Sequence, residues 1–296
     1  MSPVTTNMDA DFSVALNHFI GQEGLPEDYM NLAQEHLIPL AAWINNRKQD
    51  KPLLIGINGA QGSGKSTMTA ALAIILKQRF GYNVATLSID DLYLTRDERN
   101  KLSESIHPLL KTRGVPGTHD IQLGMERIDE LMTKNGEVSL PRFDKSMDDR
   151  MLEALWPRYK APVDILLFEG WCVATPPQSQ DELVRAVNEL EALEDKEGSW
   201  RRFVNETLAG SYQQLFEIID ALVFLKVPGF DAVTQWRGRQ ESKTFKTGEG
   251  MNALQLARFI QHFERLTRQS LEKLPGLADV VLELDDNQKI IRSVYR

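Results

Sequence analysis

The feature that most constrains the fold of this chain is the stretch Leu53–Thr67. It begins with apolar, strand-forming residues and passes through a turn that contains three glycines, and helix-forming residues follow it. The spacing Gly-x4-Gly-Lys-Ser, from Gly59 to Ser66, matches the P-loop pattern in the strand–loop–helix context that the pattern requires. A glycine-rich turn that matches by accident is the alternative, and the flanking elements argue against it. The stretch predicts a buried strand that leads into a phosphate-binding loop at the start of a helix.

The residue types in this loop are those that hold a polyphosphate. Glycine lets the backbone adopt conformations that other residues disfavour, so consecutive N–H groups can face one concavity. The Lys65 ammonium can reach the β- and γ-phosphate oxygens, and the Ser66 hydroxyl is a ligand for Mg²⁺. We therefore expect ATP with Mg²⁺ to bind here. The expected nucleotide-binding residues are Gly59, Ala60, Gln61, Gly62, Ser63, Gly64, Lys65, Ser66 and Thr67.

Strands alternate with helices along the rest of the chain, which predicts an α/β P-loop NTPase fold with a mainly parallel, doubly wound sheet flanked by helices. Helical spacing of apolar residues before the P-loop predicts a helical N-terminal extension packed on the core. The expected units are the extension (1–48), the P-loop domain (49–296), a helical insertion in it (about 176–220) and a lid (about 230–250). Two short apolar runs at the end of the chain, 280–284 and 290–295, predict a hairpin.

The amino-acid composition indicates which partners the protein binds and in which cellular compartment it is found. The net charge of −8 leaves no excess of Lys and Arg to neutralise phosphates, which argues against a general nucleic-acid binder. The single cysteine, Cys172, cannot form an internal disulfide and fits a reducing compartment. No apolar run approaches the length of a membrane span, and the N-terminus lacks the features of a signal peptide. We expect a cytoplasmic protein without a membrane or nucleic-acid partner; a homodimer is left open.

Acidic residues follow two of the predicted buried strands. Asp90 and Asp91 come after the strand 84–89, and Glu169 follows the strand 163–168. Ligands of doubly wound sheets lie beyond the C-terminal ends of the strands, so these groups are placed for work on a phosphate. As a pair, Asp90 and Asp91 offer one carboxylate to accept a hydroxyl proton and another to hold metal-bound water. Capping of a turn is the alternative for this pair, and a solvent-facing strand end is the alternative for Glu169, which we expect to organise Mg²⁺.

Cations are concentrated in the loops and in the expected lid. Arg237 and Arg239 are either surface cations of a helix or lid residues that close over the phosphates and offset charge in the transition state. A second group lies in loops between the strands and suggests a pocket for an anionic substrate, because guanidinium binds carboxylate bidentately. Its members are Arg113, His119, Arg142, Lys145 and Arg150. Lone solvent-exposed charges are the alternative for this group, and a structural role is the alternative for its histidine.

Two absent motifs restrict the reaction. The sequence contains neither the guanine-reading Asn-Lys-x-Asp nor the Leu-Ser-Gly-Gly-Gln signature of transporter ATPases. A P-loop, acids at other strand ends and a late pair of arginines are the parts that phosphoryl transfer to a small acceptor requires. The P-loop alone does not decide the reaction.

Five motifs in order resemble the D-glycerate 3-kinase family, which lies within the phosphoribulokinase, uridine kinase and pantothenate kinase group. They are Gly59–Thr67, Ser88–Thr95, Arg113–Asp120, Pro141–Ser146 and Phe168–Cys172. The resemblance implies that Asp90 acts as base, that Glu169 lies near Mg²⁺ and that Arg237 and Arg239 belong to the lid. We expect Lys65, Asp90, Glu169, Arg237 and Arg239 to be catalytic and Ser66, Asp90 and Glu169 to hold the metal. The expected substrate-binding residues are Asp91, Tyr93, Arg113, His119, Asp120, Arg142, Asp144 and Lys145.

This resemblance implies an ATP- and Mg²⁺-dependent kinase that phosphorylates a hydroxyl of a small anionic metabolite, with D-glycerate as the leading acceptor and 3-phosphoglycerate as its product. One alternative keeps the enzyme class and changes the acceptor to pantothenate, a nucleoside or a sugar phosphate. Another is a nucleotide-binding regulator or assembly factor whose P-loop drives a change of shape.

Overall fold

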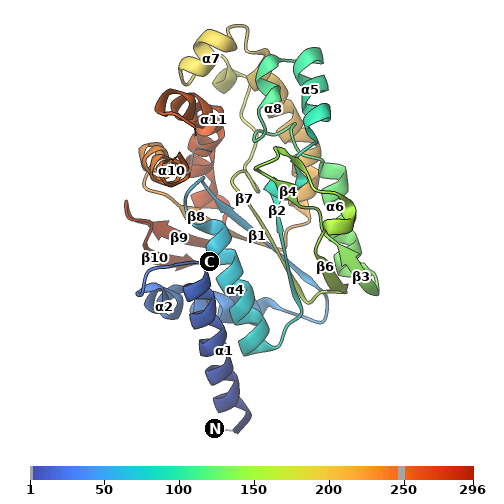
Figure 1. Ribbon diagram of the computed structural model, residues 1–296, viewed down its shortest axis with the longest axis vertical. Helices are drawn as coiled ribbons and strands as arrows, with labels where there is room; N and C mark the ends of the chain where they lie inside the picture. Colours follow the sequence, from blue (N-terminus) through green and yellow to red (C-terminus); the bar gives the residue numbers. More distant parts are fainter. Residues whose placement is uncertain (1–2, 246–250) are drawn as a thin grey trace.

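The protein is described by a computed structural model that covers residues 3–245 and 251–296. At its centre lies a six-stranded sheet in the order β10-β9-β8-β1-β7-β2 (Figure 1). The strands from β9 to β2 pair parallel, and β10 pairs antiparallel with β9 at the edge. The strands are β1 (Leu53–Gly59), β2 (Val84–Ser88), β7 (Ile165–Gly170), β8 (Ala221–Lys226), β9 (Val280–Leu284) and β10 (Ile290–Tyr295). The predicted α/β fold and the predicted C-terminal hairpin are confirmed.

Alternate residues of the central strands face two separate hydrophobic layers. Leu53, Ile55 and Ile57 of β1 belong to one cluster of buried residues, whereas Leu54 belongs to another. Strands buried on both faces are characteristic of parallel sheets covered by helices. The first layer contains α4 (Lys65–Phe80) and the second contains α6 (Ile121–Thr133). Burial on both faces fixes the register of β1 between its neighbours and hence the position of the loop at its C-terminal end.

The N-terminal helices pack on the P-loop helix. The segment contains α1 (Pro3–Gln22), α2 (Tyr29–Leu32), the π-helical η1 (Ala33–Leu37) and α3 (Ile38–Arg47). Figure 1 shows α1 beside α4, and α1 and α3 both contact that helix. Leu16, Leu37 and Ile44 are buried in the same hydrophobic cluster as α4. These residues therefore contribute to the main core.

Between β2 and β7 the chain forms a series of short elements. They are η2 (Ile89–Leu92), α5 (Arg96–Ser105), η3 (Pro108–Lys111), α6, β3 (Gly136–Ser139), β4 (Phe143–Asp144), β5 (Asp149–Arg150), η4 (Glu153–Leu155) and β6 (Arg158–Ala161). β3 pairs with β6, and β4 pairs with β5, in two small antiparallel ribbons. The β4–β5 ribbon carries the charged loop 144–149 back to the end of β2.

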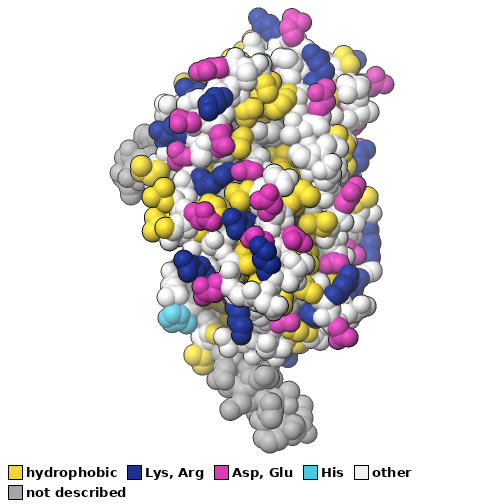
Figure 2. All heavy atoms as spheres, turned by 90° about the vertical axis from the view of Figure 1, so that its right-hand side faces the viewer, with side chains coloured by type: hydrophobic (Ala, Val, Ile, Leu, Met, Phe, Trp, Pro, Cys, Tyr) yellow, Lys and Arg dark blue, Asp and Glu magenta, His cyan; other side chains and the backbone are white. Residues whose placement is uncertain are grey.

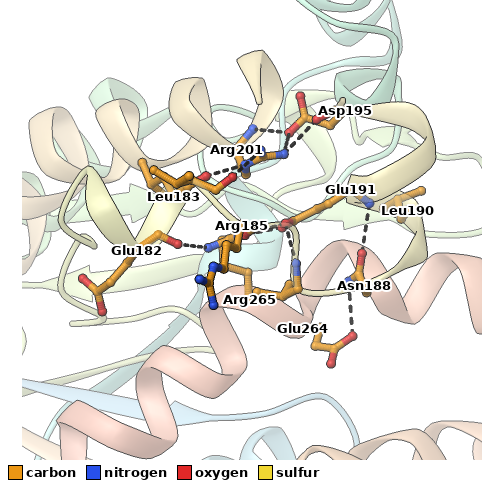
Figure 3. Close-up of polar contacts among 12 residues, drawn as sticks. Glu182, Leu183, Arg185, Asn188, Leu190, Glu191, Asp195, Arg201, Glu264 and Arg265 are labelled. Atoms are coloured by element: carbon orange, nitrogen blue, oxygen red, sulfur yellow. Dashed lines mark hydrogen bonds and ion pairs between the residues drawn. The ribbon is translucent and has the colours of Figure 1, made fainter. Parts of the chain in front are cut away.

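The insertion after β7 is helical only in its second half. It contains η5 (Asp181–Leu183), α7 (Glu189–Glu194), α8 (Ser199–Thr207), η6 (Leu208–Tyr212) and α9 (Gln213–Glu217), and 176–188 is otherwise irregular. Figure 3 shows the polar contacts that fix this irregular segment. Arg265 donates to the carbonyls of Glu182 and Arg185 at 2.9 and 2.7 Å and pairs with Glu191 at 2.6 Å. These bonds satisfy backbone groups that a helix would have satisfied internally.

Two long helices follow β8. They are α10 (Phe230–Phe245), which begins the predicted lid, and α11 (Ala253–Leu277), which contacts α10. Residues 246–250 of the predicted lid lie outside the described residues. No helix in 3–245 and 251–296 combines the length and the hydropathy that a membrane crossing requires. Figure 2 shows acidic and basic side chains interspersed over one face of the molecule, so that the described part of this face has mixed charge.

Candidate active site

The P-loop joins the C-terminal end of β1 to the first turn of α4. Gly62 and Gly64 have φ values of +77° and +82°, in the left-handed region that favours glycine. A Cβ on Gly62 would lie 3.1 Å from Cβ of Trp236, so α10 packs directly on the loop. The first N–H groups of a helix have no partner within the helix, and at the start of α4 they are available to a polyphosphate.

Three side chains meet at the start of α4. Register pairs Ile57 of β1 with Glu169 of β7, which brings this carboxylate beside the loop. The Ser66 hydroxyl donates to Oε1 of Glu169 at 2.7 Å, and Lys65 Nζ lies 3.8 Å from Oε2. Glu169 is only 5% exposed, and its Oε2 has no hydrogen-bond partner among the described residues. Mg²⁺ prefers oxygen ligands. The Ser66 hydroxyl and the unpartnered Oε2 of Glu169 are oxygen atoms that could bind this ion.

Asp90 lies at the end of β2, in η2, and has two partners. Its Oδ2 lies 2.7 Å from Nζ of Lys145, and its Oδ1 accepts a hydrogen bond from the Tyr93 hydroxyl at 2.8 Å. Burial by itself raises the pKa of Asp90, but the charges of Lys145 and Lys65 and these hydrogen bonds more than offset burial and leave the pKa below its ordinary value. The carboxylate is therefore ionised at neutral pH and able to accept a proton.

Asp91 points to a different partner. Arg142 lies 2.7 Å from its Oδ2, and the backbone N–H of Phe143 donates to Oδ1 at 3.2 Å. Burial raises the pKa of Asp91 and outweighs the lowering effect of Arg142. These bonds attach the β4–β5 ribbon to the end of β2. They hold Lys145, on the loop of that ribbon, close to Asp90.

The remaining predicted substrate-binding residues have structural partners. Arg113 pairs with Asp148, and Asp144 accepts from the backbone N–H of Ser146 at 2.8 Å. Asp120 caps α6 by accepting from the Leu123 N–H at 3.0 Å, and it also lies 3.3 Å from Arg150.

His119 is buried, with 5% exposure, between Tyr93 and Tyr212. Its Nδ1 lies 2.5 Å from the Tyr212 hydroxyl. Burial lowers the pKa of His119 to about 3, so the ring is neutral at physiological pH. A neutral, buried ring cannot attract an anion by charge; here it supports the Tyr93 ring that donates to Asp90.

A cavity of about 570 Å³ joins the P-loop, Asp90 and α10. Arg237 and Arg239 of the predicted lid both line it, together with Lys145, and Lys145 is the only residue of the predicted substrate-binding set that does so. Sequence reasoning missed three further lining residues, which are Ser88, Trp236 and Gln288. Trp236 Nε1 donates to the Asp286 carbonyl at 2.8 Å, and Gln288 donates to the Gly62 carbonyl. Ser88 could have been found from the sequence, because it lies two residues before Asp90 at the end of the same strand. The contact of Gln288 with the P-loop could not, because no local pattern links the β9–β10 loop to that segment.

Comparison with known proteins identifies the family. No family model matches the chain. A protein named uncharacterized kinase mug58, from Schizosaccharomyces pombe, is 34% identical over 228 residues, which cover 73% of this chain and 80% of that protein. D-glycerate 3-kinase, chloroplastic, from Arabidopsis thaliana is 32% identical over 223 residues, or 72% of this chain. The chain belongs to the D-glycerate 3-kinase family. The predicted membership of this family of small-molecule kinases is confirmed.

A solved structure of this family agrees over nearly the whole chain. The D-glycerate 3-kinase from Cryptococcus neoformans superposes with a TM-score of 0.73 at 25% identity, and the match covers 90% of this chain and 99% of that one. The match to the Arabidopsis protein covers only 46% of that protein's length. The comparisons therefore show the family and the fold of this chain.

Proposed function

We propose that this chain is an ATP- and Mg²⁺-dependent kinase that transfers the γ-phosphoryl group of ATP to a hydroxyl of D-glycerate, giving 3-phosphoglycerate. The observation that carries the proposal is the cavity in which the P-loop, Asp90, Lys145 and the two lid arginines face one space. These groups supply the positioning and the charge stabilisation that phosphoryl transfer requires.

Each residue has one role in the proposed reaction. The P-loop amides and Lys65 bind the phosphates of ATP, and Ser66 and Glu169 would hold Mg²⁺, which neutralises charge on the phosphate oxygens when bound. The hydroxyl oxygen of the acceptor attacks the γ-phosphorus, ADP leaves, and Asp90 accepts the proton of that hydroxyl. Arg237 and Arg239 offset the charge that develops on the transferring group. We further propose that α10, which packs on the P-loop, acts as the lid and excludes water from the cavity.

The charge of the cavity and the names of the relatives both favour D-glycerate as the acceptor. Lys145 is 62% exposed and lies on the cavity beside Asp90, where a carboxylate of the acceptor can displace it from Asp90 and pair with it. Arg142 pairs with Asp91 and so attaches the β4–β5 ribbon, which carries Lys145, to the end of β2. Proteins named D-glycerate 3-kinase are among the relatives, and D-glycerate carries one carboxylate and two hydroxyls.

An acceptor panel tests the proposal. ADP release is measured with Mg·ATP and D-glycerate, L-glycerate, pantothenate, a nucleoside or a sugar phosphate, and the product is identified by mass spectrometry. We expect D-glycerate to give the highest kcat/KM and 3-phosphoglycerate as product. Turnover confined to another acceptor overturns the assignment of D-glycerate. ATP binding without stimulation by any acceptor favours the nucleotide-binding regulator. A cytoplasmic location and the absence of nucleic-acid partners stay predictions from sequence.

A further inference from the structure

A second cavity, of about 500 Å³, lies on the other side of the start of α4. One wall is formed by the N-terminal segment from Leu25 to His36, and the opposite wall by the loop 285–289 between β9 and β10. A volume of this size is within the range of small-molecule sites. The aliphatic side chains of its lining are those of Leu25, Pro26, Leu32, Met68, Leu225, Leu284 and Ile290.

The two cavities meet at the P-loop. Gly64, Thr67 and Gln288 line both of them. The two cavities are therefore adjacent at the first turn of α4, and a molecule whose phosphates lie on that turn has its other end within reach of the second cavity. Because the transferring phosphate must lie near Asp90, which lines only the first cavity, the second one is at the opposite end of such a molecule.

The lining has the chemistry of a base pocket. Two amide side chains, Asn31 and Asn287, stand on opposite walls and can donate to and accept from the edge of a heterocycle. Tyr29 also lines the cavity, and its hydroxyl is buried without a hydrogen-bond partner among the described residues. An apolar lining with a few polar groups is the usual composition of a site for a flat organic ligand.

The charges of the cavity do not suit the anionic acceptor. Among the described residues, Lys289 is the one lysine or arginine that lines the cavity, and its ammonium is 2.6 Å from the carboxylate of Asp28 on the facing wall. The pair spans the two walls. A hydrogen bond of 2.9 Å between His36 Nδ1 and Ser293 Oγ also attaches the N-terminal segment to β10. The wall is therefore already held in place against the C-terminal hairpin, as a preformed pocket requires.

We propose that the N-terminal segment 25–36 forms one wall of the pocket that takes the adenine and ribose of ATP, so that residues outside the P-loop domain contribute to nucleotide affinity. The inference rests on the proposed function, because it requires that the triphosphate occupies the first cavity. It assigns the N-terminal extension a direct part in ligand binding, beyond its packing on α4.

Calorimetry with two ligands tests this inference. Asn31→Trp places a large ring on the exposed rim of the cavity, and Gln34→Trp is the matched control, because Gln34 is also exposed in the same segment but does not line the cavity. Each protein is titrated with Mg·ATP and with Mg·tripolyphosphate, which lacks the nucleoside. We expect Asn31→Trp to raise the Kd for ATP about tenfold or more, equivalent to at least about 1.4 kcal/mol, and to leave tripolyphosphate binding unchanged. Gln34→Trp changes neither affinity.

A second measurement does not depend on the conformation of the new ring. The wild-type protein is irradiated with 8-azido-ATP, and the labelled peptides are identified by mass spectrometry. We expect label in 25–36, and protection by ATP. Label confined to other segments overturns the inference even if tripolyphosphate binds. If the wild-type protein binds neither ATP nor tripolyphosphate, the proposed function itself is wrong.

Discussion

Replacement of Lys145 by Met should move the pH dependence of catalysis, because Lys145 is the cation closest to the proposed base. Its Nζ lies 2.7 Å from Oδ2 of Asp90, and its charge is the largest of the effects that lower the pKa of that carboxyl. Without it, the raising effect of burial is opposed only by Lys65 and by the hydrogen bond from Tyr93. The pKa of Asp90 should therefore rise in the variant.

The size of the effect follows from the geometry. An opposite charge at this distance lowers a carboxyl pKa by roughly 1–3 units. The Lys145 side chain is 62% exposed, so solvent screens the interaction and the lower end of that range, about one unit, applies. The sign is fixed: Asp90 must be ionised to accept a proton, and a higher pKa moves the loss of activity on the acid side to higher pH.

The assay is the pH profile of kcat/KM, which reports ionisations of the free enzyme and free substrates. The variants Lys145→Met and Lys145→Arg are compared with wild type over about pH 3–7, a range that starts below the ordinary carboxyl pKa of about 3.9, because the pKa of Asp90 in wild type lies below that value. Ionisations of the substrates affect the pH profiles of all three proteins equally, so a difference between the profiles reports the enzyme. We expect the acid limb of Lys145→Met to lie about one pH unit higher and that of Lys145→Arg to stay in place. An unshifted limb in Lys145→Met would refute the reasoning.

Two further predictions concern stability and the P-loop. Arg265→Met leaves the buried Glu191 carboxylate, which is 1% exposed, without its partner, and it should lower the free energy of unfolding in urea by about 3–5 kcal/mol. Arg258→Met, at an exposed pair, should cost at most about 1 kcal/mol, and equal losses would contradict the argument. Gly62→Ala should weaken ATP binding in calorimetry, because it strains a residue at φ +77° and crowds α10. Gly81→Ala, at φ +73° in open space at the other end of α4, should leave ATP affinity unchanged; a loss in both variants would point to general destabilisation.

The sequence predicts the parts of this site that depend on local pattern. The P-loop, the strand before it and the acids at Asp90 and Glu169 lie where spacing and strand ends put them, because parallel strands bring their C-terminal ends to one edge. The N-cap role of Asp120 is also local and was predictable.

Pairings between distant segments could not be predicted in this way. The Lys145–Asp90 contact depends on the small β4–β5 ribbon, and the burial of His119 depends on Tyr212 in a helix far along the chain. The irregular stretch 176–188 has helical spacing in sequence, but Arg265 satisfies its carbonyls from another helix. Periodicity carries no information about such partners.

The central claim is that Asp90 receives the proton of the acceptor hydroxyl while the P-loop holds the triphosphate. Its most direct test is Asp90→Asn, measured by single-turnover kinetics with D-glycerate and by calorimetry with Mg·ATP. The account predicts a turnover that is about 10²–10⁴-fold lower, with ATP affinity close to wild type. Turnover that stays at the wild-type rate in a folded variant would contradict it.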